Sequence, residues 1–304
     1  MTALSNNALR EIFGERLQEK VILAPYTSAR IGGPADYLID ARSADELAEI
    51  VTKLWNAESP FIILGGGSNI LFSDLGVRGV VVLNRAKAVR FDEGDQPAVW
   101  CESGAVLSNV AHRTVAQGLG GLEWAATVPG TVGGAVYGNA GAFESDIAHD
   151  LIRTDILDET GRNWWSVEKL EYGYRTSVLK RLNKKAIILS AEFRLILSTT
   201  EETQSRMEQF SAKRKATQPP GASMGSMFKN PTGDHAGRLI EASGLKGKRI
   251  GNAEISKIHG NFFINTGDAK ATDVKALIDL ARKTVKEKTG VDLELEIELA
   301  GEWK

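Results

Sequence analysis

Short apolar runs and one amphipathic stretch alternate in the first part of the chain. The runs have the length and composition of buried strands, and they lie at residues 35–41, 61–64 and 80–83. Between the first two, apolar residues recur at helical spacing: Leu47, Ile50, Val51 and Leu54. Ser43 precedes this helix, and Glu46 stands three residues later, in the spacing of a capping box. This β-α-β pattern predicts a small α/β lobe over residues 21–84, behind a helical segment at residues 1–20.

In residues 85–197, strand-like apolar runs and apolar residues at helical spacing alternate less regularly. A helix is expected near residues 105–117, where Gly118 closes it. Several strand-like runs follow, as far as residues 186–197. The mixture predicts a second lobe of the α+β class.

A third domain is expected over residues 198–304. It begins with a polar, helical stretch that ends at Pro219 and Pro220, because proline cannot continue a helix. Two further helices are followed by glycines placed as C-caps, at residues 236–242 before Gly244 and at residues 273–288 before Gly290. A domain boundary is therefore expected near Ser198.

The last segment of the chain alternates with a period of two, which predicts a half-buried strand. Its apolar face consists of Leu293, Leu295, Ile297 and Leu299. Its acidic face consists of Asp292, Glu294, Glu296 and Glu298. A water-facing edge that discourages aggregation accounts for these carboxylates as well as a catalytic role does, and the pattern selects none of them.

The composition is that of an ordinary globular protein of about two domains, with 304 residues, 42% hydrophobic and 25% charged. A formal net charge of -2 and a sequence pI of about 6.2 argue against a general binder of nucleic acids or anionic membranes. The first 20 residues contain no signal-peptide core, and no later stretch approaches membrane-spanning length. We therefore expect a cytoplasmic protein.

The cysteine and histidine residues give little support to a metal site. The single cysteine, Cys101, excludes an internal disulfide, and its alternatives are a buried apolar filler, which we favour, or a reactive thiol. The histidines have no metal-binding spacing and are His112, His149, His235 and His259. We expect no bound metal.

Two glycine clusters are the most informative local feature. The first, GGGSN at residues 65–69, follows the apolar run 61–64, and the second is PGTVGG at residues 129–134. A single cluster is equally well explained as a tight turn. Two clusters favour one large ligand with a negatively charged middle, such as a dinucleotide, because glycine-rich turns let N–H groups converge on an anion. Ile70 replaces the last glycine of G-x-G-x-x-G, and no P-loop sequence occurs, so neither common nucleotide fold is indicated.

Two further polar stretches could carry chemistry. In residues 172–177, Arg175 suits a carboxylate or phosphate, or it packs over a neighbouring tyrosine. In residues 225–231, Ser226 and Lys229 lie on a short strand-like stretch whose regular alternation would send them to opposite sides. A lone serine is usually structural, and no G-x-S-x-G elbow surrounds this one. The basic clusters at residues 213–215 and 246–249 are solvated surface or a site for a phosphate-bearing substrate.

Taken in order, these motifs resemble the UDP-N-acetylenolpyruvoylglucosamine reductases of bacterial cell-wall synthesis. The similarity covers the chain from about Val21 to the C-terminus. The matching stretches are residues 29–35, 65–69, 128–135, 139–142, 174–177, 225–231, 236–240 and 293–297. The first half is shared with wider vanillyl-alcohol-oxidase-type flavoproteins, whereas the serine stretch and the terminal glutamate segment are typical of the reductases.

The resemblance implies an α+β protein with a two-lobed FAD-binding domain of vanillyl-alcohol-oxidase type and a C-terminal α+β substrate-binding domain. The lobes would be residues 21–84 and 85–197, and the substrate-binding domain residues 198–304. FAD would be bound noncovalently, with NADPH as the reductant and a UDP-sugar as the substrate. The residues matched to FAD binding are Arg30, Gly65, Gly66, Gly67, Ser68, Asn69, Pro129, Gly130, Thr131, Gly133, Gly134, Asn139, Ala140 and Gly141.

The resemblance also implies three catalytic residues. Arg175 matches the cation that stabilises the enolate-like charge, Ser226 matches the proton donor, and Glu296 matches the carboxyl that assists at the substrate carboxylate. The residues matched to substrate binding are Arg214, Lys229 and Asn230. The reaction would be the NADPH-dependent reduction of the enolpyruvyl ether to UDP-N-acetylmuramate, in a monomer.

Some positions depart from the family pattern. Met227 replaces a commoner phenylalanine, and Tyr137 with Gly138 replaces a Met-Asn-like pair. The interval after Arg175 is too short for the tyrosine-bearing loop of one subgroup, so the chain resembles the subgroup without it. Two alternatives remain at this point: an oxidase of the same flavin fold, and a catalytically silent sugar-nucleotide-binding protein.

Overall fold

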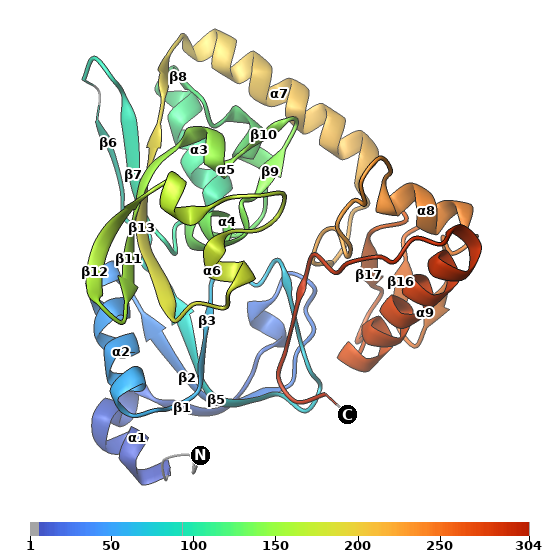
Figure 1. Cartoon of the computed structure of the whole chain (residues 1–304), viewed down its shortest axis with the longest axis horizontal. Helices are drawn as coiled ribbons and strands as arrows, with labels where there is room; N and C mark the ends of the chain where they lie inside the picture. The colour runs from blue at the N-terminus through green and yellow to red at the C-terminus, as the bar shows by residue number, and fades with distance from the viewer. Residues whose placement is uncertain (1–5, 93, 304) are drawn as a thin grey trace.

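The computed structural model describes residues 6–92 and 94–303, which form two lobes and a third unit (Figure 1). The first lobe is built on a four-stranded sheet in the order β1-β2-β5-β3. Its strands are β1 (Gln18–Ile22), β2 (Pro34–Ala41), β3 (Phe61–Leu64) and β5 (Val77–Asn84). β1 is antiparallel to β2, whereas β2, β5 and β3 are parallel. Helix α2 (Ala44–Asn56) makes the crossover between β2 and β3.

The capping of α2 follows the expected box only in part. The Ser43 hydroxyl accepts the N–H of Glu46 at 3.1 Å, as predicted. The Glu46 carboxylate, however, accepts the N–H of Arg42 at 2.6 Å and not that of Ser43. The apolar stripe of α2 is buried as expected, with Leu47, Val51 and Leu54 each 0% exposed.

The segment expected to be helical at residues 1–20 contains a helix and the start of a strand. Residues 1–5 lie outside the described residues. Helix α1 (Asn6–Phe13) buries Leu9 and Phe13 against the core of the first lobe, and a 3-10 turn (Gly14–Arg16) leads into β1. The first sheet thus begins at Gln18, because β1 pairs with the edge of β2.

The second lobe is a five-stranded antiparallel sheet in the order β12-β11-β13-β7-β6, packed against short helices. Its strands are β6 (Val89–Asp92), β7 (Ala98–Glu102), β11 (Leu151–Asp158), β12 (Gly161–Ser166) and β13 (Ala186–Arg194). Its helices are α3 (Leu107–Ala116), α4 (Val132–Gly138), α5 (Ile147–Asp150) and α6 (Val178–Arg181). Two pairs of short strands complete the second lobe. β8 (Leu119–Gly120) pairs with β14 (Ile196–Leu197), and β9 (Gly141–Ala142) pairs with β10 (Ser145–Asp146).

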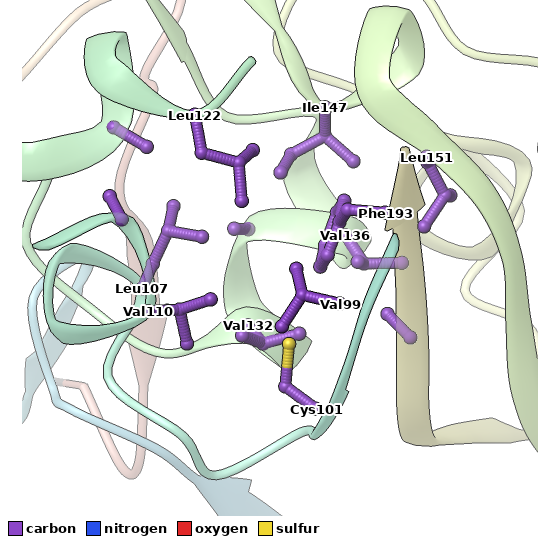
Figure 2. Packing of buried hydrophobic residues seen from close by; sticks show 14 of the residues in the cluster. Val99, Cys101, Leu107, Val110, Leu122, Val132, Val136, Ile147, Leu151 and Phe193 are labelled. Carbon is purple, nitrogen blue, oxygen red and sulfur yellow. The ribbon is translucent and has the colours of Figure 1, made fainter. Parts of the chain in front are cut away.

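The core of the second lobe contains the only cysteine. Figure 2 shows Cys101 among apolar side chains from α3, α4 and the sheet, beside Val99 and Val132. Cys101 is 0% exposed, and burial raises the pKa of its thiol to about 12. The interpretation as an apolar filler is confirmed.

The polar helix expected at the start of the third domain packs against the second lobe. Helix α7 (Thr200–Thr217) runs from the second lobe to the third unit (Figure 1). It buries Met207 in the core of the second lobe, and its Arg206 forms an ion pair with Glu123 at 2.9 Å. The buried residues of α7 are Thr203 and Met207, four positions apart on one side of the helix, so few apolar residues are needed for this contact.

The third unit contains a small antiparallel sheet and two helices. The strands are β15 (Arg249–Ile250), β16 (Ala253–Ile255) and β17 (Phe263–Asn265), and the helices are α8 (Ala236–Ala242) and α9 (Ala271–Thr289). Gly244 and Gly290 have φ values of +77° and +75°, in agreement with their expected role after these helices. Helix α9 begins two residues earlier than predicted, because the Asp74 carboxylate accepts the N–H groups of Ala271 and Thr272 at 2.8 and 2.9 Å.

The predicted C-terminal strand is mostly an extended segment without regular pairing. Only β18 (Glu298–Ala300) is a strand, and it pairs in parallel with β4 (Ile70–Phe72) of the first lobe. The predicted alternation in burial holds in part: Leu293 and Ile297 are 1% and 4% exposed and Glu294 is 72% exposed, but Glu296, on the predicted acidic face, is only 18% exposed. Regular pairing is absent because the main chain before β18 bonds to separate segments, with the N–H of Glu296 donating to the Met227 carbonyl at 3.0 Å.

Candidate active site

The two glycine loops lie against each other where the first and second lobes meet. A Cβ atom on Gly65 would stand 2.4 Å from the hydroxyl oxygen of Thr131. A Cβ atom on Gly66 would stand 3.2 Å from the Cα atom of Gly130. Gly130 itself has a φ of +106°, which side-chain-bearing residues rarely adopt. Glycine is required here because the backbones of two lobes touch.

Several N–H groups of these loops have no hydrogen-bond acceptor within residues 6–92 and 94–303. They belong to Gly66, Gly67, Ser68, Asn69, Gly130 and Thr131. Free N–H groups that converge in glycine-rich loops bind anions. The pyrophosphate of FAD has the charge that such donors require, so the loops fit the expected cofactor.

Other residues predicted to contact FAD hold the second loop in shape. The N–H of Gly133 donates to the Ser103 carbonyl at 2.7 Å. Asn139 has a φ of +47°, and its side-chain amide donates to Asp146 at 3.0 Å and to the Gly173 carbonyl at 3.1 Å. Asn139 is 3% exposed, so its side chain is part of the scaffold. A contact between these residues and FAD stays a prediction.

The remaining predicted FAD residues divide between exposed positions and main-chain contacts. Arg30, Pro129 and Gly134 are exposed near the loops. The N–H of Ala140 closes the end of α4 with a 2.9 Å bond, and the carbonyl of Gly141 accepts a bond from a guanidinium described next. Their roles toward FAD also stay predictions.

Arg175 stands in a tight turn and reaches two acceptors. The turn is closed by reciprocal bonds between Gly173 and Thr176, and Arg175 has a φ of +55°. Its Nε donates to Glu296 Oε1 at 2.9 Å, and its Nη2 donates to the Gly141 carbonyl at 2.6 Å. The Arg175 and Glu296 side chains are 25% and 18% exposed. Two of the three predicted catalytic residues thus form a half-buried ion pair between the second lobe and the C-terminal segment.

Arg175 was expected either to bind an anion or to pack over a neighbouring tyrosine, and the structure shows a carboxylate contact together with such packing. The guanidinium also lies over the Tyr174 ring, 5.4 Å from its centroid. Tyr174 is exposed, and its hydroxyl oxygen accepts the N–H of Asn230 at 3.4 Å. Stacking therefore accompanies the ion pair and does not replace it.

Burial raises the pKa of the Glu296 carboxyl. The loss of water around the ionised form is the largest cause, and the cations of Arg175, Lys180 and Lys229 act in the opposite direction. By contrast, Glu294 is 72% exposed and pairs with Lys229 at 2.5 Å. Glu296 is thus the carboxylate of this segment whose environment suits a chemical role.

Ser226 lies next to this pair along the main chain. The following residue, Met227, accepts the N–H of Glu296 on its carbonyl and donates its own N–H to the Asn261 carbonyl at 2.8 Å. The Asn261 side chain holds Phe228 through two further bonds, of 2.9 and 2.7 Å. The Ser226 hydroxyl has no hydrogen-bond partner among the described residues.

The stretch around Ser226 is not the regular strand that the sequence predicts. Met227 and Phe228 are both 0% exposed, although alternation would place them on opposite faces. Isolated bridges replace a ladder, from Ser226 to Phe262 and from Phe228 to Leu295. The main chain turns to satisfy partners on both sides, so the period-two prediction fails here.

The three residues predicted to bind substrate differ in their partners. The Arg214 side chain has no hydrogen bond or ion pair within the described part of the chain, and burial together with the nearby Arg175 charge lowers its pKa. The Lys229 side chain is 15% exposed and holds Glu294. The Asn230 side chain accepts the N–H of Ala236 at the start of α8, at 3.1 Å. Arg214 is thus the cation with most capacity for an added anion.

Two contacts to Glu296 were not predicted from the sequence. The side-chain amide of Asn69, expected to bind FAD, donates to the Glu296 carbonyl at 3.1 Å. The Lys180 ammonium lies 2.7 Å from Glu298 Oε1 and 3.5 Å from the Glu296 carbonyl. The only signal for Lys180 was its place five residues after Arg175, which does not reveal a partner more than a hundred residues away.

In the described residues there is no group of three or more histidine, cysteine, aspartate or glutamate side chains that could hold a metal ion. In the same part of the chain, no helix combines the length and apolar character needed to cross a membrane.

Comparison with known families and proteins agrees with this arrangement. Residues 35–165 match the FAD binding domain family, and residues 216–300 match the family of the UDP-N-acetylenolpyruvoylglucosamine reductase C-terminal domain. The chain is 43% identical over 282 residues to the UDP-N-acetylenolpyruvoylglucosamine reductase of Chloroflexus aurantiacus, covering 91% of this chain and 95% of the relative. It is 41% identical over 305 residues to UDP-N-acetylenolpyruvoylglucosamine reductase 1 of Bacillus anthracis, covering 99% and 100%.

A solved structure shows the same fold. The crystal structure of UDP-N-acetylenolpyruvylglucosamine reductase from Thermus caldophilus superposes with a TM-score of 0.80 at 35% identity. The match covers 94% of this chain and 99% of that chain. The expectation of an α+β fold with an FAD-binding domain is confirmed.

Proposed function

The chain belongs to the UDP-N-acetylenolpyruvoylglucosamine reductase family of FAD-containing oxidoreductases, and from this premise we propose that it uses NADPH to reduce UDP-N-acetyl-3-O-(1-carboxyvinyl)-glucosamine to UDP-N-acetylmuramate in peptidoglycan synthesis. The observation that carries the proposal is the 2.9 Å pair of Arg175 and Glu296, beside a serine whose hydroxyl has no partner among the described residues. A cation, a proton donor and a carboxyl are the groups that reduction of an enolpyruvyl ether requires.

The free N–H groups of residues 66–69 and of Gly130 and Thr131 would hold the FAD pyrophosphate. When bound, FAD supplies hydride transfer from NADPH to the enolpyruvyl group. The protein supplies position and charge. Within the described residues, no histidine or cysteine is needed to hold the cofactor in this arrangement, in keeping with noncovalent binding.

Arg175 would place a fixed positive charge at the substrate carboxylate, where negative charge develops during the reaction. Hydride addition to the enolpyruvyl group leaves enolate-like charge on that end, and a preorganised cation lowers the barrier by about 3 kcal/mol if it resembles an oxyanion-hole donor. The guanidinium is already held by Glu296 and the Gly141 carbonyl, so little reorganisation is required during reaction. Glu296 would assist at the same end of the substrate.

Ser226 would donate the proton that completes the reduction. Its main chain is fixed through Met227 and Asn261, while its hydroxyl remains free to turn toward a substrate carbon. The serine alkoxide left behind would regain a proton from water, and the cations of Arg175 and Lys229 in the same region would stabilise it until then.

The cations of Arg214 and Lys229 would bind the diphosphate of the UDP-sugar. The guanidinium of Arg214, which has no side-chain partner among the described residues, suits two phosphate oxygens, and Lys229 would exchange Glu294 for the substrate. Asn230 would contact nearby groups with the part of its amide that α8 does not use. We further propose that the protein is a monomer.

Stopped-flow spectroscopy of the flavin tests this function, because NADPH and the enolpyruvyl sugar act in separate half-reactions. For Ser226→Ala, we expect flavin reduction by NADPH within about twofold of the wild type. Reoxidation by the enolpyruvyl sugar should slow by about 10²-fold to 10⁴-fold, because only this step needs the proton.

Ser223→Ala is the matched control, three residues earlier in the same stretch, and should leave both half-reactions unchanged. Equal reoxidation rates in the wild type and Ser226→Ala would refute the role of Ser226. A wild-type flavin that oxygen reoxidises rapidly, while the sugar does not, would show an oxidase and overturn the proposed function.

A further inference from the structure

The main chain of Glu296 is held from three directions. Its N–H donates to the Met227 carbonyl at 3.0 Å, in the stretch that contains Ser226. Its carbonyl accepts the Asn69 side-chain amide of the first glycine loop at 3.1 Å. The same carbonyl lies 3.5 Å from the Lys180 ammonium of the second lobe. The position of the Glu296 carboxylate thus depends on all three parts of the molecule.

Lys180 is itself fixed by a buried turn. It belongs to α6, whose N-cap is Ser177, and the Ser177 hydroxyl accepts the Lys180 N–H at 3.3 Å. That hydroxyl also donates to the Tyr137 carbonyl at 2.6 Å, and Ser177 is 0% exposed. The base of the lysine side chain is therefore rigid relative to α4 and to the second glycine loop.

The lysine side chain leads from this base to the C-terminal segment. It is 17% exposed, and its ammonium pairs with Glu298 at 2.7 Å, two residues beyond Glu296. A lysine ammonium with so little access to water is stable only when it has partners, and here both are on the segment that carries Glu296. Arg175 and Lys180, from one turn-and-helix unit, therefore hold the side chain and the main chain of Glu296 respectively.

We propose that Lys180 is a positioning residue for the reduction of the enolpyruvyl substrate: by holding Glu298 and the Glu296 carbonyl, it orients the Glu296 carboxylate on Arg175. The proposal rests on the proposed function, in which Glu296 and Arg175 act at the substrate carboxylate. Lys180 acts through Glu296 and does not itself touch the substrate.

The electrostatic surroundings give the proposal a specific signature. The cations that face Glu296 are Arg175, Lys180 and Lys229, and all three lower its pKa against the effect of burial. Tyr137 faces Glu298, and the charge of that carboxylate contributes to raising the Tyr137 pKa. Without the Lys180 charge, the pKa of Glu296 rises further, so a rate that depends on ionised Glu296 falls at a higher pH than in the wild type.

Lys180→Met in the FAD-loaded enzyme tests the proposal. Reduction of the flavin by NADPH should stay within about twofold, whereas reoxidation by the enolpyruvyl sugar should slow about tenfold, because a small misplacement of a reacting group is costly. The acid limb of the reoxidation rate should move to higher pH. Lys180→Arg should restore most of the rate and the pH profile. The matched control is Lys275→Met, which removes another lysine paired with a carboxylate, to Asp279 at 2.6 Å on α9.

If Lys180→Met folds poorly, Glu298→Gln alone keeps the proposal testable, because it removes the same ion pair from the other side: it should slow reoxidation by the sugar and leave reduction by NADPH within about twofold of the wild type, and normal reoxidation would contradict the proposal. If Lys180→Met folds, the two variants are also combined in a double-mutant cycle. If Lys180 acts through Glu298, the double variant should reoxidise no more slowly than the slower single variant. Multiplied effects, equal slowing of both half-reactions, or wild-type behaviour of Lys180→Met would each overturn the proposal. Wild-type enzyme that the sugar does not reoxidise would instead overturn the proposed function.

Discussion

The third unit meets the first lobe and the second lobe in different ways. Toward the first lobe the contact is apolar: Ala29, Ile31 and Leu71 belong to the same buried cluster as the side chains of α8 and α9. Toward the second lobe the described contacts include ion pairs, from Arg175 to Glu296 and from Lys180 to Glu298. We call these the apolar junction and the ionic junction.

Main-chain bonds reinforce the apolar junction. β18 pairs with β4, and the Asp74 carboxylate of the first lobe caps α9. The Asn265 side chain also donates to the Ala29 carbonyl at 2.9 Å. The C-terminal segment, red in Figure 1, runs from the third unit back to the first lobe, so this junction is made at both ends of the unit.

The apolar junction contributes mainly to stability, whereas the ionic junction carries the groups proposed for chemistry. Apolar surface that leaves water contributes free energy in proportion to its area, and opening the apolar junction would lose it. The charged groups of the ionic junction are mostly shielded from water, with Arg175, Glu296 and Lys180 between 17% and 25% exposed, so the attraction within each pair is largely offset by lost hydration. The ionic junction therefore contributes little net free energy to folding, and Arg175 and Glu296 stand there with partners that a substrate's charged groups would have to replace.

Leu71→Ala is expected to have the largest effect on stability. Leu71 is 0% exposed on β4, and the cavity left by its truncation should lower the free energy of unfolding by about 4 kcal/mol. Leu38→Ala is the matched control, since Leu38 is 1% exposed in a cluster whose fully buried members all belong to the first lobe. Urea denaturation measures both losses.

Hydrogen exchange distinguishes the two leucine variants. Leu71→Ala should speed amide exchange in α8 and α9, because their cluster includes Leu71, whereas Leu38→Ala should not do so selectively. Equal exchange in α8 and α9 for the two variants would show that the apolar junction does not support the third unit.

Elements with local signals were predictable from the sequence. The strand at residues 61–64 and the helix at 236–242 have the predicted bounds, because a short apolar run and a glycine after a helix are local features. The alternating burial of the last segment was predicted at Leu293, Glu294 and Ile297 but not at Glu296, whose burial depends on partners elsewhere in the fold. The glycine clusters indicated an anion site for the same reason.

The features that the sequence could not predict are those set by residues far away in the chain. The start of α9 is set by Asp74, almost two hundred residues earlier, and the last strand is short because its neighbours lie in different parts of the fold. The roles of Arg175 and Glu296 entered as expectations from family resemblance, and their contact is visible only in the folded chain. No local pattern marked Lys180, whose partners follow only from the folded chain.

Arg175→Met tests the ionic junction and should act mainly on chemistry. Loss of the cation should raise the barrier of flavin reoxidation by about 3 kcal/mol, while reduction by NADPH is retained. Arg175→Lys is the comparison variant, because it keeps the charge but loses the planar fork. An Arg175→Met enzyme with normal reoxidation would show that the ionic junction does not hold the reacting groups.

The same variant has a pH-dependent effect on stability whose sign follows from Glu296. Burial raises the pKa of Glu296 above its ordinary value of 4.5, so its ionisation disfavours the folded state as pH rises through that range. Arg175 opposes this shift, and its loss raises the pKa further. The difference in stability between the variant and the wild type should thus stay constant below about pH 4, where Glu296 is mostly protonated in both the folded and the unfolded state, and grow progressively above that pH.

Glu294→Gln should have the smallest effect and sharpens the distinction within the acidic segment. Glu294 is 72% exposed, and an ion pair with so exposed a carboxylate contributes at most about 0.5 kcal/mol to the free energy of unfolding. Reoxidation should also be unchanged, because Glu296 and not Glu294 contacts Arg175. Release of Lys229 from its partner should, if anything, lower the KM for the UDP-sugar, and steady-state kinetics measures this. A large loss of kcat in Glu294→Gln would place the reacting carboxylate at the exposed position and contradict the assignment of Glu296.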